Sequence, residues 1–157
     1  MKRKTTRWQH ACILVIEDDP GDQEITRRAL QRDGFLADLQ IVSDGTQAMD
    51  YLLWRGSYAN APVPDLILLD LNLPGMNGKQ LLQSMKEDRT LRSTPVVVVS
   101  TSAREQDIRD CYELGCNSYA IKPLEAHRFI EQLRAIFTYW IGLVALPPRG
   151  TPPGERA

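Results

Sequence analysis

The stretch Pro64-Asp-Leu-Ile-Leu-Leu-Asp-Leu-Asn-Leu-Pro-Gly-Met-Asn-Gly78 decides the fold of this chain. Its residues Leu66 to Leu69 form a continuous apolar run between turn formers, a pattern typical of a short strand buried on both faces. Asp70 ends that run, and prolines and glycines break the pattern directly after it. Ligands bind beyond the carboxyl ends of the strands in an open parallel sheet, so we expect chemistry at Asp70. A carboxylate that only caps the following loop is the alternative at this point.

Four further apolar runs lie before and after this stretch, and segments with helical spacing separate them. Besides 66–69, we predict strands at 12–16, 39–42, 96–99 and 118–121. Helices are expected to begin near residues 20, 79, 104 and 124, with a further helix directly after the turn Asp44-Gly45, and the last one to reach Trp140. Five strands that alternate with five helices predict an α/β fold, a doubly wound five-stranded parallel sheet.

Length and composition limit the class of function. The 157 residues predict one domain, and 43% hydrophobic and 25% charged residues are ordinary values for a globular protein. A formal net charge of −1 creates no field directed at nucleic acid, and no apolar run reaches the length of a membrane span. We therefore expect no nucleic-acid partner and no membrane contact. A cytoplasmic location is expected, because the basic N-terminus lacks the apolar core of a signal peptide.

The chain divides into three parts. Residues 1–10 are predicted to be a flexible basic leader, residues 11–145 the folded domain, and residues 146–157 a disordered tail rich in proline and glycine. We expect no second core after the folded domain, so any output has to leave through its surface.

Polar side chains collect where the predicted strands end. They are Glu17, Asp18, Asp19, Asp70, Ser100 and Lys122. Right-handed crossovers place the carboxyl ends of the strands on one rim, so these residues are expected to converge. Carboxylates suit a hard cation such as Mg²⁺. Zinc is disfavoured, because no predicted strand ends in His or Cys, the ligands that zinc prefers. An Asp can accept a phosphoryl group covalently. Lys122 would then pair with one oxygen of the phosphoryl group, and Ser100 would donate a hydrogen bond to another. A structural ion pair between Lys122 and Asp70 is the alternative, and it is compatible with the unphosphorylated state.

Four motifs resemble a known family. They are Ile-Leu-Val-Ile-Glu17-Asp18-Asp19-Pro, Leu-Ile-Leu-Leu-Asp70-Leu-Asn72-Leu-Pro-Gly-Met-Asn-Gly, Val-Val-Ser100-Thr and Tyr119-Ala-Ile-Lys122-Pro123. Over about residues 11–140 the chain is similar to the receiver domain of two-component response regulators. The resemblance implies a flavodoxin-like receiver fold with strand order 2-1-3-4-5.

The resemblance also implies a role for each site residue. Asp70 is the phosphoacceptor and acts with Lys122 and Ser100. The implied Mg²⁺ ligands are Glu17, Asp18, Asp70 and the backbone carbonyl of Asn72. Ser100 and Tyr119 are the implied switch residues, and the Lys122–Pro123 peptide bond is expected to be cis. Such a protein catalyses its own phosphorylation and dephosphorylation and is not an enzyme acting on a metabolite.

Two further segments narrow the resemblance. The loop Arg55-Gly-Ser-Tyr-Ala-Asn-Ala-Pro-Val-Pro and the pair Tyr139-Trp140, followed later by Ala-Leu-Pro, are similar to the small response regulators of cyanobacterial phytochromes. This likeness implies a sensor histidine kinase of the phytochrome type as phosphodonor, and a homodimer.

A wide apolar stripe marks the last predicted helix. It contains Phe129, Ile130, Leu133, Ile136, Phe137 and Trp140. A stripe wider than the core requires predicts a partner or dimer face on the fourth helix, fifth strand and fifth helix. We assign that face to Tyr112, Tyr119, Ile130 and Phe137. Ordinary core packing is the alternative for the stripe.

Three other classes of function are alternatives. A Mg²⁺-dependent aspartyl phosphatase of the dehalogenase type would have Asp-x-Asp at the nucleophile, but Asn72 occupies the second position. A phosphorylation-independent pseudo-receiver would act only as a binding module, and such modules usually lack a site residue that this sequence retains. A nucleotide-binding flavodoxin-like protein is a third reading, without a Gly-rich phosphate loop to support it.

Overall fold

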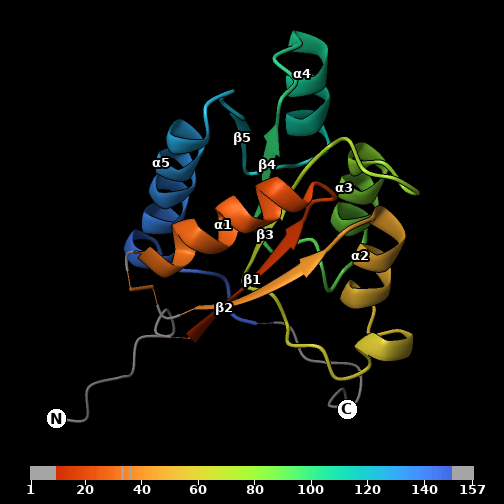
Figure 1. Ribbon diagram of the computed structural model, residues 1–157. Coiled ribbons are helices and arrows are strands. Elements are labelled where there is room, and N and C mark those ends of the chain that lie inside the picture. The colour runs from red at the N-terminus through yellow and green to blue at the C-terminus, as the bar shows by residue number, and fades with distance from the viewer. Residues whose placement is uncertain (1–9, 33, 36, 150–157) are drawn as a thin grey trace, which may run out of the picture.

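The computed structural model describes residues 10–149 except 33 and 36. Five parallel strands form one sheet in the order β2-β1-β3-β4-β5, as predicted (Figure 1). The strands are β1 (Ala11–Ile16), β2 (Ala37–Val42), β3 (Leu66–Leu69), β4 (Val96–Ser100) and β5 (Ser118–Ile121). The doubly wound α/β fold is therefore confirmed, with strand bounds close to those expected from the apolar runs.

Five α-helices connect and follow the strands. They are α1 (Pro20–Arg32), α2 (Gly45–Leu52), α3 (Gly78–Glu87), α4 (Glu105–Glu113) and α5 (Ala126–Phe137). A short 3₁₀ helix, η2 (Gly56–Tyr58), follows α2. The side chain of Asp44 caps α2 by accepting from the Gln47 N–H, and Asn77 forms a capping box with Gln80 at the start of α3.

The last helix differs from the prediction. It is not α-helical to Trp140 but changes at Thr138 to a π-helix, η3 (Thr138–Leu143). In an α-helix, residues four positions apart do not stay on one line, because a turn contains about 3.6 residues and each step rotates the side chain further around the axis. A π turn contains more residues and rotates it back. Ile141 therefore returns to the core, where it is buried, in line with Leu133 and Phe137.

The core consists of two apolar layers, one on each face of the sheet. Alternate residues of β1 and β3 face opposite layers: Leu14 and Ile67 belong to one, Ile13 and Leu66 to the other. Helices α2, α3 and α4 cover the first layer, and α1 and α5 cover the second (Figure 1). No described helix has the length and apolarity needed to span a bilayer.

Phe137 is part of the core and not of a partner face. Its side chain is fully buried in the layer under α1 and α5, and its ring meets that of Phe35 edge-on at a centroid distance of 6.3 Å. The prediction that Phe137 belongs to an exposed face is therefore wrong. Helical spacing defines the direction of an apolar stripe but does not show which edge of it the sheet covers.

The segment after η3 folds back onto the domain. Leu146 packs against the layer under α1 and α5. The guanidinium of Arg149 forms a bidentate pair with Asp65, with Nε 3.0 Å from Oδ1 and Nη2 2.7 Å from Oδ2. The same Nη2 donates to the carbonyl of His10. Residues 146–149 are thus held in place and not disordered as predicted, because a buried carboxylate anchors them. Leader residues 1–9 and tail residues 150–157 lie outside the described residues.

Candidate functional site

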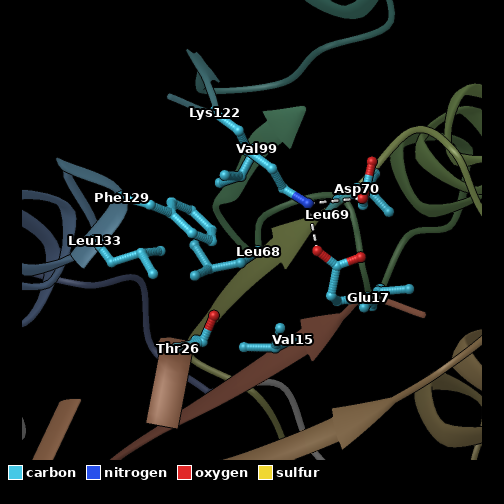
Figure 2. A pocket seen from close by; sticks show the side chains of 11 residues that line it. Val15, Glu17, Thr26, Leu68, Leu69, Asp70, Val99, Lys122, Phe129 and Leu133 are labelled. Carbon is cyan, nitrogen blue, oxygen red and sulfur yellow. Dashed lines mark hydrogen bonds and ion pairs between the residues drawn. The ribbon is translucent and has the colours of Figure 1, made fainter. Parts of the chain in front are cut away.

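The buried ammonium of Lys122 is the centre of the rim at the carboxyl ends of the strands. Its Nζ lies 2.9 Å from Asp70 Oδ2 and 2.9 Å from Asp22 Oδ2, and it also donates to Glu17 Oε1. Glu17, Asp70 and Lys122 each directly follow a strand, β1, β3 and β5 respectively. Figure 2 shows the Lys122 side chain reaching between the Glu17 and Asp70 carboxylates. The predicted convergence of these residues is therefore present in the structure.

Backbone hydrogen bonds hold the three residues in register. The Asp70 N–H donates to the Ile16 carbonyl at 3.0 Å, which continues the ladder between β1 and β3 by one residue. The Lys122 N–H donates to the Ser100 carbonyl at 2.8 Å at the end of β4. The sheet thus fixes the positions of Asp70 and Lys122, with little freedom left to loops.

Close backbone packing also restrains the loop after Asp70. A Cβ added at Gly78 would lie 2.6 Å from the Asp70 carbonyl oxygen and 2.6 Å from Leu71 Cα. Only glycine therefore lets α3 begin so close to Asp70. On the other side of the loop, the Gly45 N–H donates to the Pro74 carbonyl and ties the loop to α2.

Burial and charge perturb the protonation of this cluster. Glu17, Asp70 and Lys122 are each no more than 8% exposed. Burial raises the pKa of Glu17 to about 8, and its hydrogen bond to Asp70 adds to this while Lys122 opposes it. Burial alone would lower the pKa of Lys122, but its bonds to Glu17, Asp70 and Asp22 outweigh this and raise it. The ammonium thus stays charged and compensates carboxylates that repel one another.

Three of the carboxylates could hold a metal ion. Glu17, Asp18 and Asp70 each offer an oxygen, and these oxygens all lie within 4.8 Å of one another. Oxygen ligands of this kind fit a hard divalent cation such as Mg²⁺ or Mn²⁺. The Asn72 N–H donates to Asp70 Oδ1 at 3.1 Å, so its backbone lies beside the cluster. The donor set therefore fits the predicted cation, and the carbonyl of Asn72 as a ligand stays a prediction.

The predicted switch residues Ser100 and Tyr119 meet at Ser102. Ser100 is fully buried, and its Oγ accepts from the Ser102 N–H at 3.2 Å. The half-buried Tyr119 donates its hydroxyl to the Ser102 carbonyl at 2.8 Å. Burial raises the pKa of Tyr119, so the hydroxyl stays protonated and able to donate. Sequence reasoning did not single out Ser102, although it lies in a Ser-Thr-Ser cluster directly after β4.

An ion-pair cluster extends this connection to α3. Ser102 Oγ donates to Asp107 Oδ2 at 2.5 Å. The Lys79 ammonium on α3 bonds both Asp107 at 2.7 Å and Asp110 at 2.8 Å on α4. Ser102 thus connects the switch residues to the contact between these helices. None of this was predicted, because the pairs join segments 28 and 31 residues apart.

Two further predictions concern this end of the molecule. The Lys122–Pro123 bond, expected to be cis, is trans, as are the other peptide bonds of the described chain. Trans is the lower-energy form of an X–Pro bond, and a family likeness alone does not override that preference.

On the predicted partner face, Tyr112 is 49% exposed while Tyr119 and Ile130 are half-buried, and Phe137 lies in the core.

Comparison with known proteins identifies the family. A sequence model of the response regulator receiver domain matches residues 13–134. Response regulator Rcp1 of Synechocystis sp. is 37% identical over 135 residues, 86% of this chain and 92% of Rcp1. The crystal structure of the phosphorylated cyanobacterial phytochrome response regulator RcpA is 40% identical with a TM-score of 0.86, covering 88% of this chain and 99% of that one. The Mn²⁺-bound form of Rcp1 is 36% identical with a TM-score of 0.85, at the same coverage.

These relatives share both the fold and nearly the whole folded length with this chain. The match to the RcpA structure covers 88% of this chain, more than the residues 13–134 matched by the family sequence model. The sequence identity to RcpA is 40%, so the likeness concerns the sequence as well as the fold. The chain belongs to the response regulator receiver domain family and is related to the phytochrome response regulators.

Proposed function

We propose that Asp70 accepts a phosphoryl group from a sensor histidine kinase in a reaction that requires Mg²⁺. The observation that carries this proposal is the convergence on Asp70 of the Lys122 ammonium, 2.9 Å away, and of the Glu17 and Asp18 carboxylates. A carboxylate so placed has a cationic partner on one side and a cation site on the other. Both would stabilise charge on a phosphoryl group transferred to it.

The chemistry is an in-line displacement at phosphorus. An Asp70 oxygen forms a bond to phosphorus while the bond to the donor's imidazole nitrogen breaks, and that nitrogen keeps the electron pair. The product is an acyl phosphate on Asp70. Lys122 donates to one phosphoryl oxygen and Ser100 to another. Glu17, Asp18, Asp70 and the Asn72 carbonyl would hold the Mg²⁺ ion, which would supply further positive charge at the site.

The relatives support an assignment of the partners. Because RcpA is a cyanobacterial phytochrome response regulator, we assign a phytochrome-type histidine kinase as the phosphodonor. We also propose that the reaction takes place in the cytoplasm. We assign homodimerisation to the face formed by α4, β5 and α5, with Tyr112, Tyr119 and Ile130. Tyr112 supports this assignment because it is a large side chain that is 49% exposed. Charged residues at Tyr112 and Ile130 should convert a dimer into a monomer in light scattering. A dimer of unchanged mass would exclude this face.

Mass spectrometry of the phosphorylated protein tests the main proposal. Incubation with acetyl phosphate and Mg²⁺ should add one phosphoryl group to the peptide that contains Asp70. Both Asp70→Asn and removal of Mg²⁺ by a chelator should abolish it. An unlabelled wild-type protein that still binds its kinase would indicate a phosphorylation-independent binding module. Continuous release of phosphate from a simple ester would indicate a phosphatase.

A further inference from the structure

Lys122 bonds a third carboxylate, that of Asp22, in addition to those of Glu17 and Asp70. An ammonium has three N–H donors, and Glu17, Asp70 and Asp22 take one each. Glu17 and Asp70 also belong to the group of carboxylates that could hold a metal ion. Asp22 does not belong to it. The proposed function gives Asp22 no role, although it lies as close to Lys122 as the acceptor does.

Helix α1 fixes the position of Asp22. The Asp22 N–H donates to Asp19 Oδ1 at 2.9 Å, and its carbonyl accepts from the Thr26 hydroxyl at 2.8 Å. Thr26 is itself only 3% exposed. A carboxylate in the first turn is also favoured by the positive end of the helix dipole. Asp22 therefore offers Lys122 an acceptor whose backbone is held on both sides.

The cation and Lys122 have to share the same carboxylates. A divalent ion needs oxygens of Glu17 and Asp70, and both carboxylates already bond the ammonium. If Asp22 were absent, withdrawal of both partners would leave a buried ammonium without a counter-ion, which is costly. We propose that Asp22 is a positioning residue that retains Lys122 when Glu17 and Asp70 turn toward the cation. This inference rests on the proposed function, because it concerns the cation that the function requires.

A small cavity adjoins the Lys122 side chain. It has a volume of about 20 Å³ and is lined by Lys122, Thr26, Phe129 and Leu133 among others. Figure 2 shows Thr26, Phe129 and Leu133 on the side of Lys122 away from Asp70. The Lys122 Nζ lies 5.7 Å from the centre of the Phe129 ring. The space beside the lysine is therefore large enough for about one water molecule.

Calorimetric titration of the full chain with Mg²⁺ alone tests this inference. Asp22→Asn removes the charge but keeps the shape, so Lys122 would compete more strongly for Glu17 and Asp70. We expect the Mg²⁺ dissociation constant to rise about five- to tenfold, the order of coupling found for charges in contact. Asp22→Glu keeps the carboxylate and should restore most of the affinity. Thermal unfolding of each variant verifies that it is folded.

Asp19→Asn is the matched control. It makes the same chemical change on the same rim, but the Asp19 side chain is exposed and accepts a hydrogen bond from the Asp22 backbone N–H, not from Lys122. We expect a change in Mg²⁺ affinity of less than about twofold, because solvent screens an exposed charge. Equal losses for Asp19→Asn and Asp22→Asn would overturn the inference, because they would reflect net charge alone.

A double variant shows whether Asp22 acts through Lys122. In a Lys122→Met background, Asp22→Asn should leave the Mg²⁺ affinity nearly unchanged, because there is no ammonium to retain. The same loss in both backgrounds would contradict the inference. Absence of Mg²⁺ binding to the wild-type protein would instead contradict the proposed function. The two failures are therefore distinguishable.

Discussion

At the residue scale, Lys122 compensates carboxylates that come from three different elements. Glu17 follows β1, Asp22 lies on α1 and Asp70 follows β3, and the lysine is 8% exposed. A buried ion pair contributes little net stability, but loss of one partner leaves a charge without compensation. The stability of this rim therefore depends on either the ammonium or a bound cation.

Lys122→Met should make the stability of the protein depend on Mg²⁺. We expect a loss of about 3–5 kcal/mol in the free energy of unfolding without divalent cations, since buried carboxylates lose their counter-ion. Urea unfolding with and without Mg²⁺ measures this, and Mg²⁺ should recover part of the loss. Lys79→Met is the control, because its partners Asp107 and Asp110 lie outside the cation cluster. A Mg²⁺-independent loss in Lys122→Met would contradict this account.

At the element scale, Ser102 connects the loop after β4 to both α4 and β5. It bonds Ser100, Asp107 and Tyr119 through three different atoms. Movement of Ser100 toward a phosphoryl group would have to break or stretch the first of these bonds. The loop is thus held in its observed arrangement by contacts that phosphorylation would oppose.

Ser102→Ala should loosen this loop without affecting the rest of the fold. Loss of the side-chain bond to Asp107 should speed amide hydrogen exchange at residues 101–104 several-fold, because local opening then breaks fewer bonds. Exchange followed by mass spectrometry on peptides measures this. Ser57→Ala, in the exposed helix η2, should leave exchange in the loop as in wild type. Unchanged exchange in Ser102→Ala would show that Ser102 does not hold the loop.

The contact between α3 and α4 should weaken in acid. Hydrogen bonds from Lys79 lower the pKa values of Asp107 and Asp110 below the ordinary value of 3.8. Their contribution to stability is therefore fully present above that value and disappears as pH falls through the lowered pKa values. The difference in unfolding free energy between wild type and Lys79→Gln should be constant from pH 7 to pH 5 and shrink below about pH 4. A difference that grew in acid would contradict this assignment.

At the scale of the whole molecule, Arg149 and Asp65 join the end of the described chain to the start of β3. The Asp65 side chain is 1% exposed, and it also accepts from the Cys12 N–H at the start of β1. One buried carboxylate therefore ties together two strands and the C-terminal segment. This pair holds the amino-terminal edge of the sheet, opposite Lys122.

Arg149→Met should destabilise the protein by about 2 kcal/mol or more, because Asp65 loses a bidentate charge-assisted partner in a buried position. Chemical denaturation followed by circular dichroism measures the difference. Arg128→Met is a matched control: its pair with Glu125 is 67% and 56% exposed, so we expect a change within about 0.5 kcal/mol. Equal effects of the two substitutions would show that the segment contributes nothing beyond surface charge.

The limits of sequence reasoning follow from the range of the interactions. Asp70 and Lys122 could be located because each directly follows a short apolar strand, and the parallel topology brings such positions together. Asp22 could not be assigned, since its contact depends on how α1 is rotated over the sheet. Arg149 pairs with a residue 84 positions away, and its proline-rich surroundings predicted disorder. Phe137 was misplaced because a helical stripe does not show which of its edges is covered.

The hydrogen bond from Arg149 to the His10 carbonyl has a practical consequence for probing this protein. It brings two segments 139 residues apart together at the pole of the domain that lies opposite Asp70. A short linker between them would close the backbone, so a circular permutant opened in the exposed loop around Asn60 should still fold. Fluorophores placed near either position would report on each other while the pole that contains Asp70 stays uncovered.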